Sequence, residues 1–416
     1  MKVVELFSGI GSQVKALNYV AERHGTTIEV LNTCEWDIHA MVAYNIIHNR
    51  TPLNENVETM SKDEIVSQLI KYSLSSSGKE QMNIKSLASF ELIALKHIYS
   101  SIINNNNLVD ITTVKGNSLP KEIDLLTYSF PCQDLSNVGN FHGYNKGIDR
   151  DVKSRSGLLW EIERILEERL EQNLSLPKFL LLENVTALIA ERHNKNFIEW
   201  QNNLKAMGYT NEIYKLKATD FGIPQTRERI IMLSVMTNHN QFHEEAVRQV
   251  LDKFDIRNKD VQKDLKLSRH TLNSILRRDY TNPKVLAEAL ECQPNDTPSR
   301  VRMWNDNIKI VDENDKISTK VSTITTKQDR HPNSGNIYFN IENGKSKYRF
   351  LTPRECFMLM GFKEQDFEKL KKNNFYYREG RQFFTRDKYY RMTGNSIVVN
   401  VLEAVFEVMF KIDKII

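Results

Sequence analysis

Two predicted strands each end in a residue whose side chain is suited to chemistry. An apolar run predicts a buried strand that ends at Pro131-Cys132-Gln133, and a second run, at 179–185, carries Glu183 near its end. In an open α/β sheet, ligands bind at the carboxyl ends of the strands. A thiolate and an acid at that edge could act together on one small planar substrate, which favours covalent catalysis. Taken alone, an inert buried cysteine and a helix-capping acid explain the same residues.

A glycine turn near the N-terminus indicates a place where a ligand can approach the backbone. The turn Phe7-Ser8-Gly9-Ile10-Gly11 lies between a predicted strand and a predicted helix. The chain lacks the third glycine of a dinucleotide fingerprint and the lysine of a phosphate-binding loop, so neither dinucleotide nor ATP binding is favoured. A plain tight turn is an equally good explanation of this segment.

Three further residues suggest a ligand that contains adenosine. Glu35 follows the second predicted strand, where an acid commonly accepts hydrogen bonds from ribose hydroxyls. Trp36 could lie against an adenine ring, and Asp110, after a predicted third strand, could accept from the adenine amino group. A helix-capping acid, a core tryptophan and a loop aspartate are the alternatives. The order of the three features favours the cofactor interpretation.

Composition limits the class of protein. The chain has 416 residues, of which 40% are hydrophobic and 26% charged, as in ordinary soluble domains. No apolar run approaches the ~20 residues of a membrane span, and the N-terminus does not resemble a signal peptide. The four cysteines form no CxxC pair, so we expect no metal site, no disulfide framework and a cytoplasmic location. The net charge of +4 permits nucleic-acid binding without requiring it.

The order of predicted elements indicates an α/β fold with additions. Strands and helices alternate over 1–50 and again over 108–236, which is typical of a sheet covered by helices. The polar stretch at 50–107 predicts a helical insertion that ends in an exposed asparagine-rich loop at 104–107. The long polar stretch at 133–156 follows the candidate nucleophile. Loops of that length are usually functional or disordered, so we expect a lid there.

Short motifs occur in a fixed order along the chain. They are Phe7-Ser-Gly-Ile-Gly11, Glu35-Trp-Asp37, Asp110-Ile-Thr112, Pro131-Cys-Gln133, Glu183-Asn-Val185, Gln225-Thr-Arg-Glu-Arg229, Arg349-Phe-Leu-Thr-Pro-Arg-Glu355 and Gly394-Asn-Ser396. Together they resemble the motifs of bacterial DNA (cytosine-5)-methyltransferases of the restriction-modification or phage type. The block at 127–136 is especially similar to the CpG-methylating members, whereas the variable region shows no visible match. The resemblance therefore implies no particular recognition sequence.

The resemblance implies a large, Rossmann-like domain that depends on S-adenosyl-L-methionine, and a smaller target-recognition domain. The large domain would comprise 1–237 and 386–416, including the insertion at 50–107, and the target-recognition domain would comprise 238–385. S-adenosylhomocysteine would be the product. The implied cofactor contacts are Phe7, Ser8, Gly9, Gly11, Glu35, Trp36, Asp110, Ile111, Pro131, Asn395 and Ser396.

The same resemblance assigns the catalytic residues. Cys132 would add to C6 of cytosine, which turns C5 into the nucleophile that receives the methyl group. Glu183 would hydrogen-bond or protonate N3, Arg229 would hold the O2 edge, and Arg227 would support the site or a phosphate. The target base must leave the stacked duplex to be reached. The sequence does not identify the base that removes the C5 proton.

Four residues are assigned to DNA by family analogy. Gln133, Ser136 and Arg155 match positions near the flipped nucleotide and its phosphates. Thr325 lies in a segment that resembles the family's phosphate-touching segment, although an ordinary strand and turn would have the same residues.

The variable region contains a possible helix-turn-helix at 258–290. Ser268 is a good helix N-cap between its first two predicted helices. Arg269 and Asn273, on the second helix, would then face the major groove of DNA. A pair of amphipathic surface helices is an equally good interpretation.

The predicted function is sequence-specific methylation of C5 of cytosine in double-stranded DNA. An RNA cytosine-5 methyltransferase and a catalytically silent DNA-binding regulator are the alternatives, and the intact Cys132, Glu183 and Arg229 argue against the second. We expect a monomer that binds no membrane. In a restriction-modification system its partner would be a cognate restriction endonuclease, without a stable complex.

Overall fold

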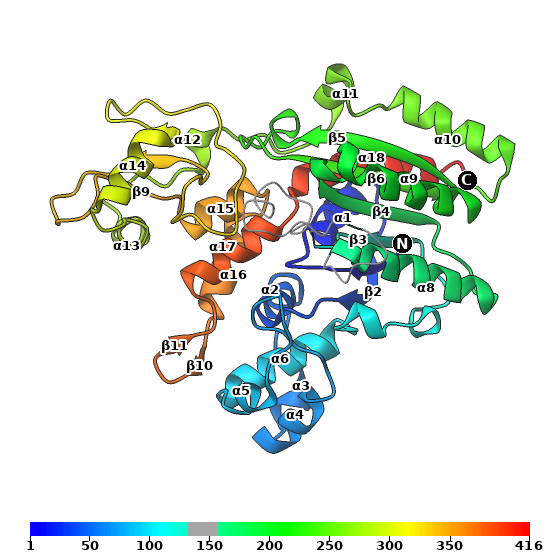
Figure 1. Ribbon diagram of the computed structural model, residues 1–416, viewed down its shortest axis with the longest axis horizontal. Helices are drawn as coiled ribbons and strands as arrows, with labels where there is room; N and C mark the ends of the chain where they lie inside the picture. Colours follow the sequence, from blue (N-terminus) through cyan, green and yellow to red (C-terminus); the bar gives the residue numbers. More distant parts are fainter. Residues whose placement is uncertain (132–147, 149–155) are drawn as a thin grey trace.

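The computed structural model describes residues 1–131, 148 and 156–416. Within these residues, the centre of the molecule is a six-stranded sheet with the strand order β2-β1-β3-β4-β6-β5 (Figure 1). Its strands are β1 (Lys2–Leu6), β2 (Glu29–Cys34), β3 (Leu125–Tyr128), β4 (Phe179–Val185), β5 (Tyr209–Lys217) and β6 (Glu228–Met236). The first four strands run parallel, whereas β6 runs antiparallel to both β4 and β5.

Helices surround this sheet and form two further regions (Figure 1). Around the sheet lie α1 (Ser12–Arg23), α2 (Ile38–His48), α8 (Leu159–Glu171), α9 (Glu191–Ala206), α10 (Gln241–Lys253) and α18 (Val399–Asp413). The insertion at 50–107 contains α3 (Glu55–Glu58), α4 (Lys62–Leu69), α5 (Ile84–Ala88) and α6 (Leu92–Asn104). No helix in the described part of the chain is long and apolar enough to cross a membrane.

The region between α10 and α18 is made of short elements. Its helices are α11 (Lys259–Asp264), α12 (Leu272–Ile275), α13 (Pro283–Glu291), α14 (Pro298–Asp306), α15 (Pro353–Leu359), α16 (Glu364–Lys372) and α17 (Arg386–Asn395). Its strands are β7 (Lys309–Val311), β8 (Asn336–Tyr338) and β9 (Tyr348–Arg349), which form one small sheet, and β10 (Tyr376–Arg378) and β11 (Arg381–Gln382), which form a hairpin. In Figure 1 most of this region lies to one side of the central sheet.

The central sheet is buried on both faces. Val3 and Leu181 belong to the core that α1 and α18 cover, whereas Val4 and Leu180 belong to the core under α8 and α9. The final helix α18 packs against α1, at the other end of the sequence, and also against α10. A sheet that is apolar on both faces is what parallel strands covered by helices require. The division into domains at 237 and 386 stays a prediction.

The helical insertion lies beside α2, at the bottom of Figure 1. Its longest helix, α6, packs against both α2 and α4. The backbone N–H of Glu91 donates to the carbonyl of Tyr377 (2.9 Å), and the ring of His97 stacks on Phe375 with centroids 4.3 Å apart. The insertion therefore connects α2 with the β10–β11 hairpin.

Two local predictions from the sequence are wrong at the end of the insertion. The asparagine-rich run at 104–107 is not an exposed loop, because Asn105 and Asn107 are buried and their amides bond to neighbouring segments. No third strand precedes Asp110 in the described structure; Asn107 forms only an isolated bridge with Thr33. The asparagine side chains satisfy the buried polar groups that a ladder would otherwise pair.

A fully buried carboxylate lies within the central sheet. Glu5 of β1 accepts hydrogen bonds from the backbone N–H of Val14 (3.0 Å) and the hydroxyl of Tyr44 (2.5 Å). Burial raises the pKa of Glu5 from 4.5 to about 7, although both hydrogen bonds oppose the rise. Between these two pKa values the native protein binds a proton at Glu5 that the unfolded chain does not bind.

This difference predicts that Glu5 lowers the free energy of unfolding of the protein as the pH rises. The cost is absent below the unfolded pKa and fully present above the folded one, where it is on the order of 3 kcal/mol. Urea unfolding of the wild type and of Glu5→Gln, from about pH 5 to about pH 8, measures the effect. We expect the wild type to lose stability relative to the variant over this range. Parallel pH profiles for the two proteins would contradict the prediction.

Candidate active site

Several of the predicted catalytic and cofactor residues lie at the carboxyl edge of the parallel strands. The glycine turn follows β1, Glu35 follows β2, Pro131 lies shortly after β3, and Glu183 lies near the end of β4. The side-chain amide of Asn184 donates to the carbonyl of Phe130 (3.1 Å) and joins the ends of β3 and β4. Cys132, Gln133, Ser136 and Arg155 lie outside the described residues.

Glu183 and Arg229 form a largely buried ion pair at this edge. The antiparallel register sets Glu183 opposite Ile231 and Val185 opposite Arg229, so the acid and the arginine share one face of the sheet. Arg229 Nε lies 3.3 Å from Glu183 Oε1. Burial raises the pKa of Glu183 above its ordinary value, and the charges of Arg229 and Arg227 oppose the rise without cancelling it. The carboxyl group can therefore keep a proton to a higher pH than an exposed glutamate.

Arg227 binds three backbone carbonyls from distant parts of the chain. It donates to Ile324 (3.1 Å), Gly394 (3.1 Å) and Ser396 (2.7 Å). These contacts join the start of β6 to the segment that carries Thr325 and to the end of α17. In the structure Arg227 therefore stabilises the packing of these segments against each other. Its catalytic role stays a prediction.

Gln225 adds a second brace beside Arg227. Its buried side chain donates to the carbonyl of Leu359 (2.8 Å) and accepts from the backbone N–H of Ile324 (2.8 Å). Gln225 belongs to one of the motifs in the sequence, but no role was predicted for it. Because its partners lie more than ninety residues away along the chain, no local pattern could have revealed them.

The glycine turn has the backbone geometry that its residues predict. Gly9 and Gly11 adopt positive φ angles of 54° and 79°, and Phe7 shares this left-handed region with φ of 58°. A Cβ at Gly11 would lie 2.2 Å from His48 Nε2, so only glycine fits there, whereas a Cβ at Gly9 would meet nothing within 4 Å. The open space at Gly9 leaves room for a ligand against the backbone.

Glu35 is held between the glycine turn and the loop that follows β2. One carboxylate oxygen accepts from the backbone N–H of Gly9 (3.1 Å) and the other from that of Asp37 (2.8 Å). Desolvation raises the pKa of Glu35 to about 7, and the nearby Asp37 carboxylate adds to the rise. Trp36, next to Glu35, is partly buried.

Asn107 links Glu35 to the Asp110 segment, and sequence analysis missed it. Its side-chain oxygen accepts from the backbone N–H groups of Glu35 (3.0 Å) and Val109 (2.9 Å), and its amide donates to the carbonyl of Glu35 (3.0 Å). Asp110 accepts from the backbone N–H (3.0 Å) and hydroxyl (2.7 Å) of Thr112 and so caps a short 3₁₀ helix that begins at Ile111. Proximity to Asp110 in the sequence was the one signal available for Asn107.

The predicted C-terminal cofactor residues lie at the end of α17. Ser396 is buried, and its hydroxyl lies 2.5 Å from the hydroxyl of Ser12, which begins α1 directly after the glycine turn. Asn395 is exposed. The far C-terminal motif therefore lies beside the N-terminal one.

The described residues predicted to contact DNA lie in two places. The hydroxyl of Thr325 donates to the carbonyl of Lys327 (2.6 Å), in the segment that Arg227 braces. Arg269 donates to the carbonyl of Gln262 (2.7 Å), and Asn273 is exposed on α12. Their contacts with DNA stay predictions.

The helix at Asn273 differs from the one that the sequence predicts. Its N-cap is Thr271 rather than Ser268, and the helix has only four residues. Leu272 and Ile275 are buried, so tertiary packing fixes this short turn of helix. The helix-turn-helix interpretation of 258–290 stays a prediction.

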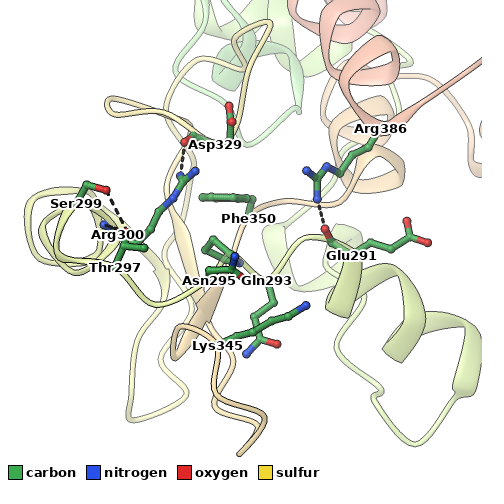
Figure 2. A pocket seen from close by; sticks show the side chains of 11 residues that line it. Glu291, Gln293, Asn295, Thr297, Ser299, Arg300, Asp329, Lys345, Phe350 and Arg386 are labelled. Atoms are coloured by element: carbon green, nitrogen blue, oxygen red, sulfur yellow. Dashed lines mark hydrogen bonds between the residues drawn. The ribbon is translucent and has the colours of Figure 1, made fainter.

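A polar hollow of about 540 Å³ lies among α13, α14, β9 and the start of α17 (Figure 2). Arg300 reaches across it to the carbonyl of Asp329, and Arg386 reaches to the carbonyl of Glu291. Lys345 lines the hollow as well. Within the described part of the chain, none of these three cations forms an ion pair with a carboxylate, so their positive charges remain available to an anion.

Comparison with known proteins decides the family. The family of C-5 cytosine-specific DNA methylases matches residues 75–411 of this chain. The chain belongs to that family. It is a DNA (cytosine-5-)-methyltransferase (EC 2.1.1.37), an enzyme that transfers a methyl group to cytosine in DNA. The resemblance inferred from the motifs is thereby confirmed.

Relatives and a solved structure agree with this assignment. The methylase is 32% identical over 413 residues to the orphan methyltransferase M.SssI of Spiroplasma monobiae, covering 98% of this chain and 96% of the relative. It is 30% identical over 413 residues to the type II methyltransferase M2.ScrFI of Lactococcus lactis subsp. cremoris, covering 99% of each. The crystal structure of S. pombe Dnmt2 methyltransferase has a TM-score of 0.57 at 18% identity and covers 99% of this chain and 98% of that one. This likeness confirms the predicted α/β methyltransferase fold.

The ion pair at the sheet edge predicts how Glu183 titrates. Two positive charges lower the pKa of Glu183, and that of Arg229 has the larger effect. Arg229→Met removes it, so the pKa of Glu183 should rise further. The pH dependence of kcat/KM for DNA measures the shift, and the rate itself should fall by about a hundredfold or more because a positioned donor is lost. Arg229→Lys, which keeps the charge, is the matched control and should shift the pKa less. An unchanged apparent pKa in Arg229→Met would contradict the assignment.

Proposed function

We propose that this methylase transfers a methyl group from S-adenosyl-L-methionine to C5 of cytosine at a short specific sequence in double-stranded DNA. Cys132 is the nucleophile, and the target base is flipped out of the duplex. The observation that carries the proposal is the buried pair of Glu183 and Arg229 at the sheet edge where the strand leading to Pro131 and Cys132 ends.

The side chains divide the work on the cytosine ring. The Cys132 thiolate forms a bond to C6, and the electron pair of the C5–C6 double bond becomes available at C5. Glu183, with its raised pKa, holds a proton against N3, where negative charge develops, and Arg229 hydrogen-bonds O2. After C5 has gained the methyl group, loss of the C5 proton to a base restores the double bond and expels Cys132.

The pocket beside this centre fits an adenosine-containing methyl donor. Gly11 leaves no room for a side chain, the space beside Gly9 is open, and the Glu35 carboxylate lies between them and the Trp36 loop. Glu35 accepts hydrogen bonds from the ribose, Trp36 packs on the adenine, and Asp110 accepts from its amino group. When bound, S-adenosyl-L-methionine supplies the electrophilic methyl group and leaves as S-adenosylhomocysteine.

Base flipping follows from the depth of the catalytic pair. The side chains of Glu183 and Arg229 are only 9% and 17% exposed. A cytosine stacked in a duplex cannot reach such groups, and extruding it costs a few kcal/mol of stacking and pairing energy. Gln133, Ser136, Arg155 and Thr325 contact the flipped nucleotide and its phosphates.

The biological setting is proposed from the relatives. One relative is named an orphan methyltransferase and another a type II methyltransferase. This methylase acts as a cytoplasmic monomer, and any restriction endonuclease of the same system recognises the same sequence without a stable complex.

Bisulfite sequencing tests the reaction, the nucleophile and the site together. Unmethylated plasmid incubated with the protein and S-adenosyl-L-methionine should show protected cytosines in one short motif. Cys132→Ser, which keeps the size of the side chain without the reactive thiolate, should protect none. Protection by the variant would refute the role of Cys132. Absence of protection with the wild type, together with methylation of competing RNA, would refute the DNA substrate.

The polar hollow of Figure 2 predicts phosphate contacts away from the catalytic centre. Arg300→Gln and Arg386→Gln should each weaken DNA binding. Each should also make the negative slope of log K (the association constant for DNA) against log[salt] less steep by about one, because each arginine displaces a counterion. Fluorescence anisotropy with cognate and unrelated duplexes should show similar losses for both. Arg257→Gln is the control, since Arg257 already pairs with Glu212 and Asp255. A salt slope equal to that of the wild type would refute the contact.

A further inference from the structure

We propose that Arg391 and the helical insertion position the Glu35–Asp37 loop for the methyl donor, and that Arg391 is a positioning residue of this methylase. The inference rests on the proposed function, because it concerns the same cofactor pocket. It also gives a role to the insertion at 50–107, for which the sequence suggested none.

The insertion binds the backbone of the loop on both sides of Asp37. Ser75 and Asp37 form an isolated parallel bridge. In it, the N–H of Ser75 donates to the carbonyl of Trp36 (2.8 Å), and the N–H of Ile38 donates to the carbonyl of Ser75 (2.9 Å). Ser75 is fully buried, so these bonds are shielded from water. The loop that carries Trp36 is thereby fixed by a segment that is not part of the central sheet.

Arg391 of α17 contacts both the Glu35–Asp37 loop and the insertion. Its Nη2 donates to Asp37 Oδ1 (2.8 Å) and lies 2.6 Å from Asp37 Oδ2, and its Nη1 donates to the carbonyl of Ser76 (3.0 Å). The side chains of Arg391 and Asp37 are 19% and 10% exposed. The two terminal nitrogens of one planar guanidinium thus hold Asp37 and the insertion together in a largely buried contact, which fixes geometry as well as distance.

The position of Asp37 in turn fixes the Glu35 carboxylate. The backbone N–H of Asp37 donates to one oxygen of the Glu35 carboxylate, and Gly9 donates to the other. Asp37 also caps α2 by accepting from the N–H of His39 (3.0 Å). A shift of Asp37 would therefore turn the Glu35 carboxylate away from the open space at Gly9.

The helix α17 contacts two of the segments predicted to bind the cofactor. Its middle holds Asp37 through Arg391, and its end places Ser396 against Ser12 at the start of α1. Without Arg391, the largely buried carboxylate of Asp37 would lose its ion pair with an arginine, and the Glu35–Asp37 loop would be free to move. The binding of the donor should suffer before the chemistry at cytosine does.

Calorimetric titration of the full-length protein with S-adenosylhomocysteine tests the inference without requiring turnover. Arg391→Met should raise Kd by roughly tenfold to a hundredfold, the loss expected when hydrogen bonds to a charged group are removed. KM for S-adenosyl-L-methionine should rise in parallel, whereas KM for DNA should stay unchanged. Arg391→Lys, which keeps the charge but cannot hold Asp37 and Ser76 with two nitrogens of one plane, should give a smaller rise in Kd.

A matched control separates positioning from general stability. Arg23 joins α1 to Glu403 and Glu407 of α18, with a side chain 22% exposed, away from the pocket. Arg23→Met should lower Tm and leave the Kd of S-adenosylhomocysteine unchanged. Asp37→Asn combined with Arg391→Met should bind no more weakly than the weaker of the two single variants, because the two residues act as one contact.

The outcomes distinguish the two proposals. An unchanged Kd in folded Arg391→Met, or an equal loss of affinity in Arg391→Met and Arg23→Met, would overturn the positioning role. If Arg391→Met does not fold, Arg391→Lys decides, and a Kd equal to that of the wild type would overturn the inference. A wild-type protein that binds no S-adenosylhomocysteine would overturn the proposed cofactor itself.

Discussion

The antiparallel pairing of β4 with β6 is the constraint on which the rest of the site depends. It sets Arg229 on the same face as Glu183, so that a carboxyl group can be buried at the sheet edge with a cation beside it. Two residues just before β6 form hydrogen bonds with distant parts of the chain. Gln225 and Arg227 hold segments that lie about a hundred or more residues further along the chain. The strand β6 and the residues just before it thus organise both the Glu183–Arg229 ion pair and the surrounding loops.

Burial of acids recurs around this centre and has a different consequence in each place. Glu5 is enclosed in the sheet, where its raised pKa only costs stability at high pH. Glu35 and Glu183 lie at the carboxyl edge, where desolvation also raises the pKa of each carboxyl group. Desolvation therefore only costs stability at Glu5, whereas in the proposed function it lets Glu183 hold a proton against N3 of cytosine.

The helix α17 connects the region of short elements with the cofactor side of the sheet. Arg386 at its start lines the polar hollow, and Ser396 after its end contacts Ser12. The final helix α18 then packs on α1 and anchors this connection in the core. A single helix can therefore hold the polar hollow and the glycine turn in a fixed relative position.

The sequence by itself determined the family and the parts whose signals are local. Apolar runs predicted β3, which is followed by Pro131, and β4, which carries Glu183, and glycine predicted the turn at Gly11, where a Cβ has no room. Only the tertiary structure decided that Asn107 holds Glu35 and that Arg391 holds Asp37, a pair 354 residues apart in the chain. It also decided the short helix α12, which is fixed by buried Leu272 and Ile275. The reason is physical: periodicity and turn chemistry act between neighbours in sequence, whereas buried polar contacts form between whichever groups folding brings together.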